Sequence, residues 1–162
     1  MDREQFISII KEHQPLIYKI CYTYCRAPED RKDLQQEVML QLWHSFKHFD
    51  GRVKITTWMY KVALNTAISF YRSERKHQDK RLPINEEIIS LPDEDDLPEK
   101  ENIRMLYQLI NQMNDLDKAL ILLYLDDNKY KDIADILGIT ETNVATKISR
   151  LKQHLKEQFN NL

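Results

Sequence analysis

Glycine, cysteine and long apolar runs are all scarce in this chain. Its 162 residues include two glycines and two cysteines, and no run of β-branched residues alternates with polar ones as in a strand. No apolar run is long enough to span a bilayer or to form the core of a signal peptide, so we expect a cytoplasmic protein without membrane insertion. Charged residues make up 31% of the chain. This composition predicts an all-α protein.

The groups that could perform covalent chemistry are few and scattered. Cys21 and Cys25 lie one helical turn apart, where a disulfide would constrain little, so two buried free thiols are favoured. The five histidines have no paired nucleophile, and the chain has neither a metal-ligand pattern nor a glycine loop to hold phosphate. We therefore expect no enzyme activity, no catalytic residue, no metal and no cofactor.

Charge is unevenly distributed along the chain. Residues 1–82 hold 15 Lys and Arg against 10 Asp and Glu, residues 83–102 hold one against eight, and residues 103–162 hold eight against eight. The acidic stretch also carries three prolines and too little apolar surface to fold alone. The pattern predicts two small helical domains, residues 1–80 and 103–162, joined by a flexible acidic linker at residues 81–102.

The first half of the N-terminal domain predicts helices separated by proline. Phe6 begins an amphipathic helix that Pro15 should end or kink and that Leu16 to Tyr24 should continue, and the next helix should run from about Asp30 to Lys47. In that next helix a core ridge recurs every four residues, at Leu34, Val38, Leu42 and Phe46.

Another set of residues in this helix lies away from the core ridge. A polar rim around leucine and tryptophan is typical of a protein-docking surface. Spacing by itself favours a simpler interpretation, in which the tryptophan packs beneath a neighbouring helix. The set comprises Asp33, Gln36, Glu37, Leu40 and Trp43.

The stretch 49–76 predicts a loop followed by a long basic helix. Thr56 or Thr57 could cap the helix, and no glycine or proline interrupts it up to Lys76. One face should pack through Met59 and Ala63, and the other should be basic. Cations contact phosphates, an amide can read a base edge and an indole can stack on a base, although any basic amphipathic helix has such a face. The exposed set is Trp58, Lys61, Asn65, Arg72, Arg75 and Lys76.

The C-terminal domain ends in a predicted helix-turn-helix. A short helix from Tyr130 to Leu137, with Leu137 inward, precedes a turn at Gly138 and a long helix capped by Thr140. The outer face carries small polar groups for base edges, with cations for phosphates, and favours DNA binding over a plain helical hairpin. Its residues are Thr142, Asn143, Thr146, Lys147, Ser149, Arg150 and Gln153, with Lys152 and Lys156 beside them.

Three motifs in fixed order precede this helix-turn-helix. Residues 33–43 read DLQQEVMLQLW, residues 49–51 read FDG and residues 57–67 read TWMYKVALNTA. Together they resemble the extracytoplasmic-function (ECF) group of bacterial RNA polymerase sigma factors. The resemblance covers nearly the whole chain, and the order and spacing of the first three motifs make it specific.

The resemblance implies a function for each domain. The first domain would bind core polymerase and recognise and open the minus-ten promoter element, and the second would bind the minus-thirty-five element and the β flap. Asp33, Gln36, Glu37 and Trp43 match the family surface that docks on the β′ clamp helices. Phe49 and Asn65 match positions that help hold a flipped base. The family also implies an anti-sigma factor as partner.

The recognition helix departs from the family pattern at two positions. Family recognition helices often carry arginine where this chain has Ala145, and an aromatic residue or histidine where it has Ser149. The remaining alternative is a stand-alone helix-turn-helix regulator that binds DNA without polymerase and dimerises through its N-terminal domain.

Overall fold

The structure, a computed structural model, describes residues 2–25, 27–78 and 101–161. For residues 71–78 and residue 101 it describes the backbone alone. Within these ranges the protein is built from helices without a strand, which confirms the predicted all-α class. The chain divides into two compact units, residues 1–90 and 91–162, and each is described by itself.

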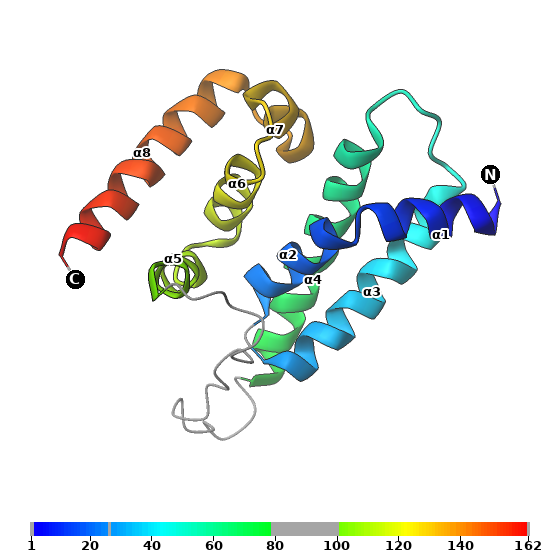
Figure 1. The fold of residues 1–162 in the computed structure, drawn as a ribbon, viewed down its shortest axis with the longest axis horizontal. Coiled ribbons are helices and arrows are strands. Elements are labelled where there is room, and N and C mark those ends of the chain that lie inside the picture. Colours follow the sequence, from blue (N-terminus) through cyan, green and yellow to red (C-terminus); the bar gives the residue numbers. More distant parts are fainter. Residues whose placement is uncertain (1, 26, 79–100, 162) are drawn as a thin grey trace. The chain divides into compact units, whose positions relative to one another are not determined.

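The described part of the N-terminal unit, residues 2–25 and 27–78, contains four helices (Figure 1). α4 packs most extensively against α3 and also contacts α2, while α2 packs on α3. These three helices enclose a core that includes Ile20, Leu34, Leu42 and Met59, all fully buried. The predicted ridge of α3 is therefore the inner face of this unit. The helices are α1 (Arg3–Glu12), α2 (Gln14–Tyr24), α3 (Pro28–Phe46) and α4 (Ile55–Gln78).

The helix is interrupted at the proline-containing segment, as the sequence predicts. α1 ends at Glu12, and Pro15 stands in the first turn of α2, so it helps to begin the second helix. A proline is tolerated there because the first turn has no partner for its N–H groups, and its fixed φ suits a helix start. α1 begins at a capping box, in which Asp2 and Gln5 satisfy each other's backbone N–H groups at 2.8 and 3.2 Å.

The start of α4 differs from prediction. The helix begins at Ile55, and Trp58 N–H already donates to the carbonyl of Lys54. Thr57 therefore lies inside the first turn, where it is 5% exposed, and neither Thr56 nor Thr57 is the residue before the helix. Packing of this turn against the core overrides the capping preference of threonine.

The C-terminal unit is a second, separate helical core. Ile110, Leu120, Leu123, Ile133 and Ile148 are buried in it. Its helices are α5 (Glu101–Asn111), α6 (Asp115–Leu125), α7 (Tyr130–Leu137) and α8 (Glu141–Asn160). The predicted linker at 81–102 lies outside the described residues except for its last two, which form the start of α5.

Local capping and turn signals define the helix ends of the C-terminal unit, and those at Gly138 and Thr140 match the sequence prediction. Asn114 accepts from the N–H of Asp117 at 2.9 Å and caps α6, and Thr140 accepts from the N–H of Asn143 at 3.1 Å and caps α8. Gly138 ends α7 with φ +70°, in the left-handed region. In α7 the inward residues are Ile133, Ala134 and Ile136, whereas Leu137, predicted to face inward, is half-buried.

Candidate functional site

An aromatic cluster joins the end of α3 to the start of α4. The ring of Trp58 lies 6.0 Å from that of Phe46 and 5.2 Å from that of Phe49, measured between centroids. Phe46 is buried, and the other two rings are half-buried. Trp58 therefore presents only part of its indole to solvent, and the cluster anchors both ends of the intervening loop.

The loop between these helices projects a cation. Gly51 turns the chain with φ +79°, and Asp50 accepts from both the backbone N–H and the side chain of Arg52 at 3.1 and 3.0 Å. The Arg52 side chain is 88% exposed. An ion pair this exposed contributes little to stability, so the guanidinium can exchange its partner for a phosphate.

The outer face of α4 carries three exposed polar residues spaced four apart. Lys61, Asn65 and Ser69 lie on consecutive turns and are exposed. Asn65 lies two turns beyond Trp58 on nearly the same side, about 10 Å along the axis at 1.5 Å per residue. The side chains of Arg72, Arg75 and Lys76 lie outside the described residues, although their backbone continues α4.

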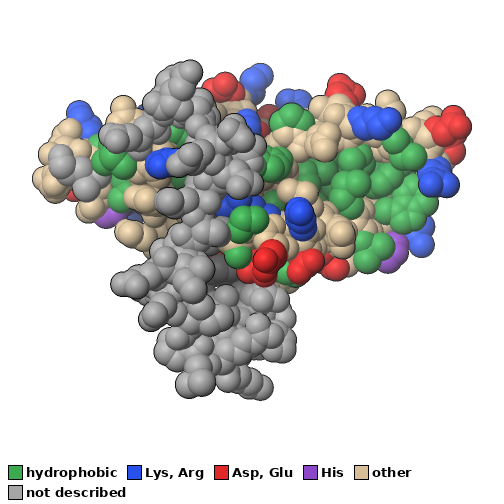
Figure 2. Space-filling view, turned by 60° about the horizontal axis from the view of Figure 1, so that its bottom comes forward, with side chains coloured by type: hydrophobic (Ala, Val, Ile, Leu, Met, Phe, Trp, Pro, Cys, Tyr) green, Lys and Arg blue, Asp and Glu red, His purple; other side chains and the backbone are tan. Residues whose placement is uncertain are grey.

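The second predicted set, on α3, includes a stripe that faces solvent. Asp33 and Gln36 are exposed, and Leu40 and Trp43 are 45% and 42% exposed. Met39 joins this stripe at 37% exposure and was missed in the sequence analysis, although its spacing from Trp43 is four residues. Figure 2 shows hydrophobic side chains gathered on one face of the N-terminal unit, with both basic and acidic side chains around them.

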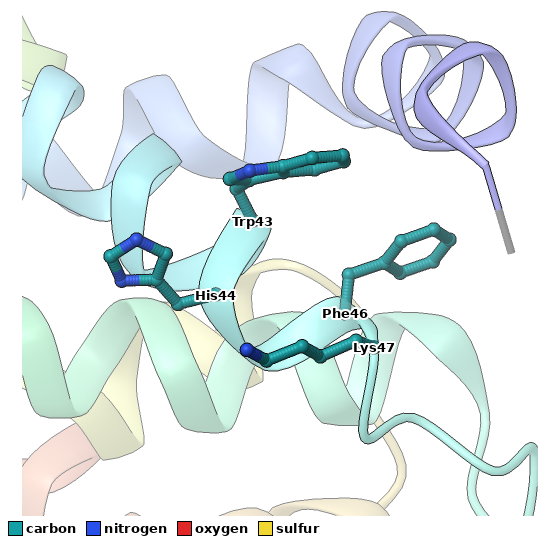
Figure 3. A pocket seen from close by; sticks show the side chains of 4 residues that line it. All are labelled: Trp43, His44, Phe46 and Lys47. Carbon is teal, nitrogen blue, oxygen red and sulfur yellow. The ribbon is translucent and has the colours of Figure 1, made fainter.

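Trp43 both packs against a neighbouring helix and remains accessible for docking, which were the two alternatives considered from sequence. Its ring meets that of Phe6 on α1 at 5.0 Å, at an angle of 60°, yet much of the indole remains accessible. Beside it lies a pocket of about 260 Å³ lined by Trp43, His44, Phe46 and Lys47. Figure 3 shows the rings of Trp43 and Phe46 directed the same way, while the side chain of Lys47 runs back beneath His44.

Glu37 lies at the border between the α3 stripe and α4. It is half-buried, and its carboxylate accepts a 3.0 Å hydrogen bond from the amide nitrogen of Gln41. Both residues line an open groove together with Asn65 of α4. Gln41 was missed in the sequence analysis, although its position four residues after Glu37 places the two side chains on adjacent turns.

The helix-turn-helix presents the predicted polar face on α8. Thr142, Thr146, Ser149, Arg150 and Gln153 are exposed and recur at three- and four-residue spacing. Asn143 is also exposed, and Lys147 is half-buried. Val144, Ile148 and Leu151 are buried on the opposite side, so the helix is held by one face and leaves the other accessible.

Lys152 has a different environment from the one expected of a phosphate contact. Its ammonium group lies 5.1 Å from the centre of the Tyr124 ring, and a hydrogen bond with Tyr124 raises the pKa of Lys152. Tyr124 in turn lies 6.5 Å from the ring of Tyr130. The contact between Lys152 and Tyr124 therefore links α8 to α6. The two residues are far apart in the sequence, so the sequence patterns did not predict this contact.

Both cysteines are buried thiols that form no disulfide, as predicted. Burial, with a smaller contribution from Cys25, raises the pKa of the Cys21 thiol to about 12. Among the residues that the structure describes, no group of three His, Cys, Asp or Glu side chains could hold a metal ion. In the same part of the chain, no helix is both long and apolar enough to cross a membrane.

Comparison with known proteins defines the class of this two-unit helical protein. Residues 9–77 match the model of sigma-70 region 2, and residues 103–155 match that of sigma-70 region 4. The first match contains α2, α3 and most of α4, and the second contains the helix-turn-helix. The chain therefore belongs to the sigma-70 family.

Relatives matched over most of their length assign the chain to one group within this family. The ECF RNA polymerase sigma factor SigW of Bacillus subtilis is 26% identical, over 99% of this chain and 92% of its own length. The ECF RNA polymerase sigma-E factor of Haemophilus influenzae is 25% identical, over 98% and 89%. The chain is a member of the ECF group of sigma factors, as the sequence motifs indicate.

Solved structures share the fold. The sigma factor RpoE of Bartonella quintana, solved with the anti-sigma factor NepR, has a TM-score of 0.74 at 16% identity, covering 97% of this chain and 98% of its own. CnrH, solved with the cytosolic domain of CnrY, has a TM-score of 0.70 at 14% identity, covering 99% and 90%. At these identities the likeness concerns the fold alone.

Proposed function

We propose that this protein binds core RNA polymerase in the cytoplasm, directs it to specific promoters and initiates transcription by capturing melted minus-ten DNA. The observation that carries the proposal is the presence, in one chain, of a region 2 unit with an exposed polar α4 face and a region 4 unit with an exposed polar α8 face. The protein acts by binding, and the polymerase performs the chemistry.

Each part of the chain has its own task in this proposal. Residues 1–80 bind polymerase and the minus-ten element, residues 81–102 link the domains, and residues 103–162 bind the minus-thirty-five element and the β flap. The polymerase surface is the α3 stripe, which would dock on the β′ clamp helices. Its exposed leucine and tryptophan within a polar rim are the features that support it. The stripe comprises Asp33, Gln36, Met39, Leu40 and Trp43, with Glu37 at its edge.

The minus-ten surface follows the loop and α4. The aromatic pair Phe49 and Trp58 is partly accessible for stacking, Lys61 contacts phosphate, and Asn65 hydrogen-bonds an extruded base. Arg72, Arg75 and Lys76 extend the phosphate contacts. Unstacking a base costs a few kcal/mol, and its capture by these groups offsets that cost, so opening is thermodynamic.

The minus-thirty-five surface is the outer face of α8, which would lie in the major groove. Arg150 and Lys147 contact phosphates or guanine, and the small polar groups meet other base edges. Arg150 is exposed and supports this arrangement. The full set is Thr142, Asn143, Thr146, Lys147, Ser149, Arg150 and Gln153.

Regulation by an anti-sigma factor forms part of the proposal. Two proteins of the same fold were solved with a partner: RpoE with the anti-sigma factor NepR, and CnrH with the cytosolic domain of CnrY. An exposed apolar stripe on α3 would need a cover while the protein is separate from polymerase. Affinity capture from resting and stressed cells should recover a small inhibitory protein in at least one condition.

The decisive experiment is run-off transcription with purified core polymerase on genomic fragments. Wild type should yield transcripts that core polymerase alone does not make, and Asn65→Ala and Trp43→Ala should weaken them. Tight sequence-specific binding by the protein alone, without transcripts, would instead favour the stand-alone helix-turn-helix regulator.

A further inference from the structure

Five exposed residues of α3 recur at alternating steps of three and four positions. We call them the α3 seam: Asp33, Gln36, Leu40, Trp43 and Lys47. Because a helix has about 3.6 residues per turn, a row with this spacing runs nearly parallel to the axis and drifts by only about 20° in seven residues. This is the spacing with which one helix packs lengthwise against another. The α3 seam therefore fits a helical partner.

The α3 seam is apolar in the middle and oppositely charged at its two ends. Leu40 and Trp43, which are 45% and 42% exposed, form the middle. Asp33 supplies a carboxylate near the start of the helix, and Lys47 supplies an ammonium group at the residue that follows its last turn. Each charge lies seven residues from Leu40, which is about 10 Å along the axis at 1.5 Å per residue. The two opposite charges are thus placed evenly on either side of Leu40.

A surface arranged in this way is complementary to itself. If a second copy of α3 is turned by 180° about an axis beside Leu40, the two helices run antiparallel, and each Asp33 lies opposite Lys47 of the other copy. The two leucines meet at the axis, and each Trp43 lies about 4.5 Å further along. A parallel pair would instead set carboxylate against carboxylate and ammonium against ammonium, which is repulsive. Charge therefore selects the antiparallel arrangement.

Two further properties of the chain favour such an association. The formal net charge is −2, so the overall repulsion between two copies is weak. Met39 is 37% exposed beside the α3 seam, so a second copy would remove additional apolar area from water. Exposed ion pairs fix the register of a contact more than they add to its affinity. The affinity would therefore come chiefly from the apolar middle of the α3 seam.

We propose that the free protein forms an antiparallel homodimer through the α3 seam, and that this dimer withholds the polymerase-docking surface. Four of the five seam residues also belong to that surface, so a second copy and core polymerase exclude each other. Dimerisation follows from the α3 seam alone, whereas the competition with polymerase rests on the proposed function. One helix from each copy makes a small interface, so we expect a Kd on the order of 10 µM and a dimer that dissociates on dilution.

Charge reversal of the full-length protein tests the paired ends, with sedimentation equilibrium as the measurement. Asp33→Lys sets lysine against lysine at both ends and should raise the dimer Kd at least about tenfold, and Lys47→Asp should do the same through facing carboxylates. The protein that carries both changes regains both pairs, and its Kd should return to within about threefold of wild type. Asp135→Lys makes the same change of charge at an exposed residue of α7 and should leave the Kd unchanged.

Thiol crosslinking tests the position of the twofold axis. The two native cysteines are buried, so an added surface thiol is the one that reacts. Leu40→Cys should be joined to its own copy by a short bismaleimide, because this residue lies at the axis. Gln108→Cys, exposed on α5, should not be joined. Equal crosslinking of the two variants would contradict the proposed axis. Circular dichroism establishes that each variant is folded.

The outcomes separate this inference from the proposed function. Wild type that stays monomeric at concentrations well above the expected Kd would overturn the inference alone, because promoter-directed transcription does not require a dimer. A dimer whose Kd is unaffected by Asp33→Lys uses another face and would overturn it as well. Core polymerase should dissociate the dimer into complexes with one copy each, and complexes with two copies would contradict a shared surface. A dimer that forms while wild type neither binds polymerase nor directs transcription would overturn the proposed function and leave the homodimer standing.

Discussion

The indole of Trp43 on α3 meets the ring of Phe6 on α1 edge to face, with centroids 5.0 Å apart. Phe6 is buried and also lies 5.3 Å from the ring of Phe46, whereas Trp43 is 42% exposed. The pair therefore connects the outer stripe of α3 to the core. Trp43 is held in place from one side and accessible from the other, which is the arrangement of an anchor residue at a protein interface.

Replacing Trp43 should weaken polymerase binding more than it weakens the fold. Trp43→Ala should raise the Kd for core polymerase at least tenfold, because a partly exposed anchor loses its contact area. Loss of the aromatic pair should cost about 1 kcal/mol of folding stability. Competition for core polymerase, monitored by fluorescence anisotropy, gives the first value, and urea unfolding gives the second. Ile7→Ala, which truncates a residue 40% exposed on α1 outside the α3 stripe, is the control. Equal affinity of wild type and Trp43→Ala would remove this residue from the docking surface.

Replacing Asn65 should impair promoter opening without affecting stability. The side chain is exposed, so Asn65→Ala should change the free energy of unfolding by no more than about 0.5 kcal/mol. Loss of a base contact should reduce open complex about tenfold, as measured by permanganate reactivity of melted thymines. Gln108→Ala removes an exposed amide from α5 and should leave opening unchanged. Normal opening by Asn65→Ala would contradict base capture by this residue.

Any substitution of Gly138 should lower the stability of the C-terminal unit. Its φ is +70°, and a Cβ built there meets no atom within 4 Å, so the penalty comes from the backbone alone. Gly138→Ala should lower the stability of this unit by about 1–2 kcal/mol, and Gly138→Asn by less, because asparagine adopts the left-handed region more readily. The order of the two urea midpoints checks the explanation. If Gly138→Asn lowers stability as much as Gly138→Ala does, the cause is steric and the backbone explanation is wrong.

The thiol of Cys21 should resist modification until the protein unfolds. Burial raises its pKa from the ordinary value of 9.0 to about 12, so the reactive thiolate is almost absent at pH 8. Between pH 9 and 12 the unfolded state loses this proton first, and stability should fall by up to about 1.4 kcal/mol per pH unit. Below pH 9 the thiol is protonated in both states and has no effect. In Cys21→Ala, the fall in stability between pH 9 and 12 should lack the contribution of this thiol. Rapid labelling of native Cys21 by iodoacetamide would contradict its burial.

Sequence patterns located most of the helices but misplaced the start of α4. The period-four ridge of α3 and the cap at Thr140 are local signals, and they determined elements that the structure contains. Pro15 was expected to end or kink a helix; α1 ends at Glu12, and Pro15 lies in the first turn of α2. Proline is compatible with either side of such a break, and the choice depends on which turn packs into the core.

The amino-acid sequence by itself determined the helical class, the helix-turn-helix and the motifs of the ECF sigma factors, because each depends on residues close together in the chain. Only the tertiary structure decided that Trp43 contacts Phe6, that Lys152 lies over the Tyr124 ring, and that Glu37 and Gln41 share a groove with Asn65. These relationships join different helices. The packing of the helices sets them, and helical periodicity within one segment carries no information about which turn of another helix lies opposite.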